Sequence, residues 1–211
     1  MKRLMTLALV VLLTAMVVLP IVAQTGKIRF SAMAGLNFAK LRGKDAGSGL
    51  KTRTGLHGGG LVSAELGPSL AVQSGLYYSQ EGTSVDVGGG ITGTVKIDYL
   101  EVPLYLRGHT TLQGTTPLRP YLYAGPALGF KVGCTIEASN GTNSASVNCD
   151  DPTANFDVKG TQFGLHFGAG VEIGRFSLGG RYQLGLRSID NTGGNADVKN
   201  SVFALSAGYR F

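Results

Sequence analysis

The sequence has 211 residues, a formal net charge of +6, 33 glycines and no tryptophan. This length is enough for one domain or one barrel. The positive charge is mild and not clustered, which argues against a nucleic-acid-binding protein, and the glycines lack the period of collagen. Glycine occurs instead within stretches where apolar and polar residues alternate.

Residues 1–23 have the pattern of a cleavable secretory signal peptide. Two basic residues precede an apolar stretch at 4–19, and Ala23 ends a plausible cleavage site. An uncleaved anchor helix is the alternative, because the apolar stretch is somewhat long. The sequence therefore predicts an exported protein with a single domain over residues 24–211.

Eight stretches of this domain alternate with the period of two that is typical of β-strands. In the first, "KIRFSAMAGLNFA", Phe30 and Leu36 fall on one face, and Arg29 and Asn37 fall on the other. The stretches are 27–39, 54–67, 70–81, 95–107, 119–131, 163–173, 176–186 and 201–211. Because no stretch has a convincing helical period, the sequence predicts an all-β protein.

The connections between these stretches differ in length. Those at 67–69 and 174–175 are minimal and the one at 108–119 is intermediate, whereas 40–53, 82–94, 132–158 and 188–200 are long and polar. Short periplasmic turns and long outer loops are typical of outer-membrane barrels. A soluble sandwich is the alternative, but its strands would be shorter and its polar faces richer in Lys and Glu.

The apolar faces of the eight stretches carry no charged residue, as contact with lipid requires. We therefore predict an eight-stranded antiparallel up-and-down transmembrane β-barrel in an outer membrane, with outer-membrane lipid around it. The last stretch, "SVFALSAGYRF", would close the barrel against the first and present Phe211 to the barrel-assembly machinery. Pro103 and Pro126 interrupt ladder hydrogen bonds, and we expect local distortion at each without a change of register.

The chain resembles the PorT-like family of small outer-membrane β-barrels. The likeness is carried by "VKIDYLEVPLYLRG" at 95–108, "RPYLYAGPALGFKVG" at 119–133 and "GLHFGAGVEIGRFSLGGRYQLGL" at 164–186. The resemblance implies a fold and an outer-membrane location rather than a reaction. Because the namesake of the family is associated with a protein-secretion apparatus, an accessory subunit of such an apparatus is one alternative function.

The interior of an eight-stranded barrel is just wide enough for side chains to fill it. Buried charges need partners, so we predict ion pairs across the lumen. They lie at three depths: Glu65 and Glu172 with Arg29, Arg107 and Arg210 at the periplasmic end, Glu101 with Arg181 near the middle, and Glu81 with Arg187 and Lys131 near the outer mouth. Tyr77, Tyr99, Tyr105, Tyr121 and Tyr123 are expected beside them. A filled lumen predicts a monomer that acts through its loops; a narrow diffusion channel is the alternative.

Catalysis is not expected. His57, His109 and His166 stand in three different segments, and none has a serine and a carboxylate at a recognisable spacing, although Ser63 and Glu65 share a face with His57. The glycine-rich "GAGVEIG" is followed by a turn and a strand rather than by the helix that dinucleotide binding requires. The sequence predicts a non-enzymatic protein without metal or cofactor.

Two features of the predicted loops have chemical consequences. Cys134 and Cys149 share the loop at 132–158 of an exported chain, which predicts a disulfide, with two free thiols as the alternative. The loop at 40–53 is rich in cations that could contact lipopolysaccharide phosphates, although a merely solvated loop is the alternative. These cations are Lys40, Arg42, Lys44, Lys51 and Arg53.

Overall fold

The computed structural model describes residues 27–149, 151, 158–191 and 197–211. The predicted signal peptide lies outside the described residues. Within these ranges, no helix combines the length and the apolar character needed to cross a membrane.

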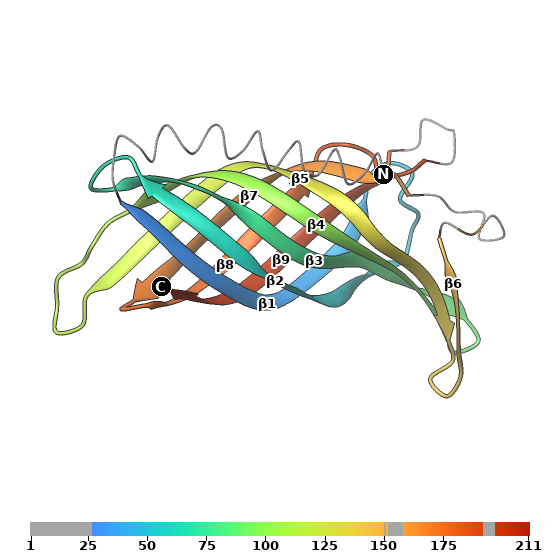
Figure 1. Cartoon of the computed structure of the whole chain (residues 1–211). Helices are drawn as coiled ribbons and strands as arrows, with labels where there is room; N and C mark the ends of the chain where they lie inside the picture. Colours follow the sequence, from blue (N-terminus) through green and yellow to red (C-terminus); the bar gives the residue numbers. More distant parts are fainter. Residues whose placement is uncertain (1–26, 150, 152–157, 192–196) are drawn as a thin grey trace.

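The described residues form nine antiparallel strands (Figure 1). They are β1 (Ile28–Arg42), β2 (Leu50–Glu65), β3 (Leu70–Gly88), β4 (Ile91–His109), β5 (Leu118–Ser139), β6 (Ser144–Asn148), β7 (Thr161–Ile173), β8 (Phe176–Gly185) and β9 (Lys199–Arg210). The all-β antiparallel prediction is confirmed. The ninth strand is the short β6, which falls in a stretch predicted as a loop.

Each of the eight longer strands pairs with two neighbours. The pairings follow the chain from β1 to β5, pass from β5 to β7, β8 and β9, and then join β9 to β1. The β1–β9 ladder extends from Ser31↔Arg210 to Arg42↔Lys199. Strand β6 pairs with the end of β5, and this hairpin projects beyond the other strands (Figure 1).

The alternation of the sequence decides which side chains face outward. On β1, Phe30 and Leu36 are 55% and 44% exposed, whereas Asn37 is fully buried. The same arrangement holds on the other strands, where the exposed side chains include Leu56, Leu106, Leu122, Phe167, Leu178, Phe203 and Leu205. The outer face of the sheet is therefore apolar, and the charged side chains of the strands gather on the inner face, which is the reverse of a soluble protein.

The strands continue further than predicted at one end. Strands β3 and β4 extend through most of the predicted loop at 82–94, because Thr and Val keep alternating there, and only 89–90 separates them. Gly88, Gly89 and Gly90 supply the positive φ angles of this tight turn. Strands β1 and β2 likewise extend into 40–53, which leaves a connection of 43–49.

The register is uninterrupted at Pro103, which pairs with Ala127, and at Pro126, which pairs with Leu165. It changes instead between Asp98 and Tyr99 of β4, where β5 contains an extra, unpaired residue, Val132. This β-bulge reverses the alternation, so that both Lys131 and Cys134 are buried although they are three residues apart.

Candidate functional site

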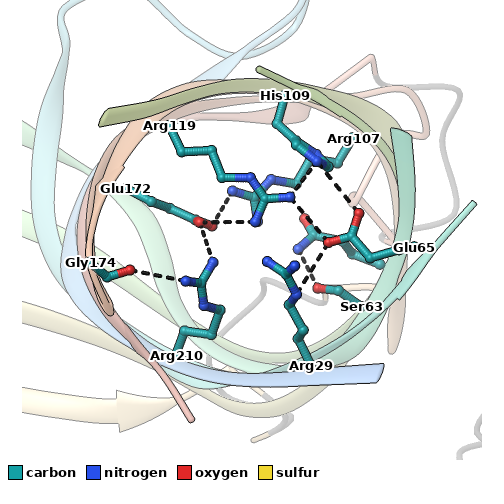
Figure 2. Close-up of polar contacts among 10 residues, drawn as sticks. Arg29, Ser63, Glu65, Arg107, His109, Arg119, Glu172, Gly174 and Arg210 are labelled. Carbon is teal, nitrogen blue, oxygen red and sulfur yellow. Dashed lines mark hydrogen bonds and ion pairs between the residues drawn. The ribbon is translucent and has the colours of Figure 1, made fainter. Parts of the chain in front are cut away.

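The inward-facing side chains form the candidate site, and they gather in two charged clusters and one apolar cluster. We call the end with the connections 66–69, 110–117 and 174–175 the short-turn end, and the opposite end the loop end. The mouth cluster, at the short-turn end, consists of Arg29, Glu65, Arg107, His109, Arg119, Glu172 and Arg210 (Figure 2). The central cluster consists of Glu81, Glu101, Gln162, His166, Arg181 and Gln183.

In the mouth cluster, Glu65 on β2 has three cationic or potentially cationic neighbours. Its Oε1 lies 3.4 Å from Nε of Arg29 and 3.3 Å from Nη2 of Arg119. Its Oε2 lies 3.5 Å from Nε2 of His109. Oε1 of this carboxylate therefore lies between two guanidiniums, and Nε2 of His109 also accepts a hydrogen bond from Arg119.

The second carboxylate of the cluster, Glu172 on β7, is surrounded in the same way. Nη1 of Arg210 donates to its Oε2 at 2.6 Å, and Arg107 donates to its Oε1. Nη1 of Arg119 lies 3.6 Å from Oε2, so this guanidinium stands between the two carboxylates (Figure 2). The sequence analysis missed Arg119, although it shares the inward face of β5 with Tyr121 and Tyr123.

Tyrosine rings lie next to the mouth cluster. The rings of Tyr105 and Tyr123 are 4.7 Å apart, and the Arg107 guanidinium lies 4.0 Å from the Tyr121 ring centroid. Facing glycines make room for these rings, because a Cβ atom on Gly170 would lie 2.5 Å from the Tyr121 hydroxyl. The glycine-rich stretch at 168–174 therefore has a packing role.

The central cluster is closed to solvent. Glu81, Glu101 and Arg181 are 0%, 1% and 3% exposed, and Nη2 of Arg181 lies 3.9 Å from Oε2 of Glu101. Nε2 of Gln162 donates to Oε1 of both glutamates at 3.1 Å, and Nε2 of Gln183 donates to Glu81 at 2.8 Å. Two carboxyl groups and one guanidinium are thus buried together.

The structure places the three residues that were predicted near the outer mouth in three different environments. Glu81 lies beside Glu101 in the central cluster rather than nearer the outer mouth. Lys131 is buried on β5, as an inward position requires. Arg187 is exposed, and its predicted place in the lumen is wrong because β8 ends at Gly185 and the alternation stops there.

The three histidines have different partners. Nε2 of His57 lies 2.8 Å from the hydroxyl of Ser206, and a hydrogen bond of 2.6 Å joins Nδ1 of His166 to the Tyr105 hydroxyl. Ser63 accepts a hydrogen bond from Gln73 instead of meeting His57. Nδ1 of His57 has no hydrogen-bond partner among the described residues, so no carboxylate there orients its ring for base catalysis.

The part of the chain that the structure describes contains no candidate metal centre. Within 27–149, 151, 158–191 and 197–211, His, Cys, Asp and Glu form no group of three that could hold a metal ion.

An apolar cluster covers the lumen at the loop end. The predicted disulfide between Cys134 and Cys149 is present and lies within this cluster. Its buried members are Leu41, Ile97, Tyr99, Cys134, Cys149, Val158 and Ile189. The disulfide joins β5 to the residue that follows β6, and so closes the base of the β5–β6 hairpin.

The five cations predicted as a lipopolysaccharide contact do not form one free patch. Arg53 donates to the backbone carbonyl of Glu81, and Nη2 of Arg42 donates to the carbonyl of Gly185 at 2.6 Å. Lys51 is exposed but pairs with Asp86. Lys40 and Lys44 are also exposed, Lys40 near the end of β1 and Lys44 in the 43–49 connection.

A further ion pair at the loop end joins the first residue of β9 to the segment before it. Nζ of Lys199 lies 2.6 Å from Oδ1 of Asp197, and the amide of Asp197 donates to Oδ2 of Asp45 at 2.8 Å. The hydrogen bond from Lys199 lowers the pKa of Asp197 below its usual value. These contacts connect the 43–49 segment with the start of β9.

Three comparisons with known proteins relate the chain to others. The family model for the outer membrane protein beta-barrel domain matches residues 22–191. No curated protein matches the chain. Among solved structures, Ail of Yersinia pestis is 18% identical, with 87% of this chain and 98% of that one covered and a TM-score of 0.41. OprG of Pseudomonas aeruginosa is 13% identical, with 87% and 95% covered and a TM-score of 0.42. Since the family model covers most of the sequence, the chain belongs to the outer membrane protein beta-barrel domain family.

Proposed function

We propose that the chain is a closed, eight-stranded barrel that spans the outer membrane, carries no enzymatic activity and acts through its loop end. The short turns would face the periplasm. An exposed apolar surface on every long strand supports a lipid environment. Aromatic pairs near the two ends of the strands, such as Phe38 with Phe203 and Phe176 with Tyr209, support two interfacial girdles.

One observation carries the proposal of a filled lumen: the side chains of the middle layers are closed to solvent from both ends. Tyr77, Tyr99 and Tyr105 are at most 1% exposed, and they lie beside buried charges rather than along a water path. An open channel would expose its lining to water. A lumen that is filled at this depth leaves the loop end as the surface available for interactions.

Planar-bilayer conductance of the refolded protein tests this function. We expect no discrete channel steps from the wild-type protein. Insertion of the wild-type protein into the bilayer is verified separately, by the protection of its strands from protease. Reproducible steps from the wild-type barrel would instead establish the narrow diffusion channel.

The partners at the loop end are also part of the proposal. Lys40 and Lys44 are exposed cations that could contact lipopolysaccharide phosphates, whereas Arg42 and Arg53 already bond to the barrel. Neutralising Lys40 and Lys44 together should weaken lipopolysaccharide binding, and an unchanged affinity would remove this contact. The narrower PorT-like assignment, with its link to secretion, stays a prediction.

A further inference from the structure

The mouth cluster holds more positive than negative charge. Four arginines, Arg29, Arg107, Arg119 and Arg210, surround the two carboxylates of Glu65 and Glu172, so the cluster has an excess of two positive charges even with His109 neutral. A cluster that only filled the lumen would be expected to balance, because partly buried unpaired charge is costly.

The excess also appears as unused hydrogen-bond donors. Each guanidinium carries several N–H groups, whereas the two carboxylates are already surrounded. Nε of Arg107 is buried and has no hydrogen-bond partner among the described residues. Arg29 reaches Glu65 only at 3.4 Å.

A cavity lies among these groups and opens toward the short-turn end. The four arginines line it together with the hydroxyl-bearing Tyr121 and Ser177. A fifth arginine, Arg175, lies at its edge and donates a hydrogen bond to the Tyr209 hydroxyl. The Arg29 and Arg210 side chains are 32% and 27% exposed, so solvent reaches the cluster, whereas Arg107 and Arg119 are 13% and 16% exposed at its inner side. Figure 2 shows guanidinium groups from opposite walls pointing toward one another across the ring.

We propose that the mouth cluster is a binding site for a small dianion of the phosphate class, taken from the solution at the short-turn end. Two negative charges match the excess of the cluster. Planar guanidinium forks bind phosphate oxygens in pairs, and several of them arranged around one cavity give a dianion more donors than chloride can use. In the proposed orientation, this solution is the periplasm.

Titration calorimetry of the refolded protein in detergent, with inorganic phosphate at constant ionic strength, tests the site. We expect one phosphate per barrel, bound at least about tenfold more tightly than chloride. Arg119→Gln should weaken phosphate binding by about tenfold or more, since a hydrogen bond to a charged group is worth roughly one to two factors of ten. Arg210→Gln, at the exposed edge, gives the same test if the Arg119 variant does not fold.

A carboxylate variant separates a binding site from a structural ion-pair network. Glu172→Gln removes a group that competes with phosphate for the same guanidiniums, so phosphate should bind more tightly to this variant than to the wild-type protein. A merely structural cluster predicts no gain. Unchanged or weaker binding by a folded Glu172→Gln protein would therefore overturn the proposal.

Arg187→Gln is the matched control, because it removes one exposed positive charge from the loop end, just beyond the last residue of β8. Its phosphate affinity should equal that of the wild-type protein, and a loss as large as that of Arg119→Gln would show that phosphate binding depends only on the overall charge of the protein.

Vesicles of phosphatidylcholine with and without phosphatidylglycerol identify the source of the ligand. At an ionic strength that screens the charge of the vesicle surface, lower phosphate affinity with phosphatidylglycerol indicates a lipid headgroup in the site, and equal affinity indicates free phosphate.

Discussion

Gly168 on β7 lies directly opposite Tyr123 on β5, and the tyrosine ring fills the space where a side chain at 168 would stand. A Cβ atom on Gly168 would lie 2.3 Å from Cζ of Tyr123. No real Cβ tolerates such a contact, so the glycine is required by the ring rather than by the backbone. The lumen is therefore packed by pairs in which a tyrosine on β5 lies opposite a glycine on β7.

This pair predicts that Gly168→Ala lowers the free energy of unfolding by about 1 to 3 kcal/mol, the usual cost of overpacking. Urea unfolding of the refolded barrel in lipid measures it. Gly180→Ala is the matched control, because its Cβ would point outward with the nearest atom at 3.7 Å. In a Tyr123→Leu background the cost of Gly168→Ala should largely disappear; a cost that persists would mean that the backbone, not the ring, requires glycine.

The central cluster predicts opposite results for two charge-removing substitutions. Arg181→Gln leaves Glu81 and Glu101 buried without a cation and should cost about 3 to 5 kcal/mol. Glu81→Gln leaves one carboxylate with one guanidinium, and we expect a change of less than about 1 kcal/mol or a gain. The same unfolding measurement decides; equal losses for both variants would contradict this charge count.

Loss of the disulfide should loosen the loop end without opening the lumen. Cys134 and Cys149 enclose a separation of 15 residues, for which the chain-entropy relation gives about 3 kcal/mol. We expect Cys134→Ser, Cys149→Ser to lower stability by up to that amount and to speed proteolysis within 135–148. Bilayer conductance should remain absent, because the central tyrosines are unchanged. Channel steps after reduction would show that the apolar cluster, not the centre, seals the lumen.

Acidification should weaken the ion pair at the start of β9. A carboxyl group whose pKa is lowered in the folded protein contributes stability above its ordinary pKa, and this contribution is lost as the pH falls through the folded value. NMR titration of Asp197 should give a midpoint below that of an unpaired aspartate. Lys199→Gln should raise the midpoint toward the ordinary value, with a smaller shift left by the backbone and charge of Lys44, and an unchanged midpoint would assign the whole shift to other neighbours.

The sequence predicts the faces of the strands well because alternation is local. It predicts contacts across the lumen less well, since these depend on the stagger between strands that are distant in sequence. Glu81 and Glu101 meet through Gln162, which is about 60 or more residues from either, and no local pattern indicates this contact. The inward position of Arg119 is predictable from the sequence, because residues two apart in a strand share a face and Arg119 lies two residues before Tyr121.

The ends of the strands were predicted least accurately. Polarity marks where a strand leaves the lipid, whereas pairing stops only where the backbone turns. Strands β3 and β4 therefore remain paired until Gly89 and Gly90, although their outer residues read as a loop. Arg187 shows the reverse error, because the predicted inward position assumes that the alternation of β8 continues past Gly185, where the strand ends.

The extra residue Val132 divides β5 into a part before it and a part after it, and the side chains that face the interior follow a different alternation in each part. Before Val132 in the sequence, odd-numbered residues of β5 face the interior; after it, the even-numbered Cys134 does. Substitutions or insertions in the projecting hairpin can therefore alter its shape without shifting which residues of the part before Val132 meet lipid. An epitope inserted at 140–143 should therefore leave assembly of the other eight strands intact.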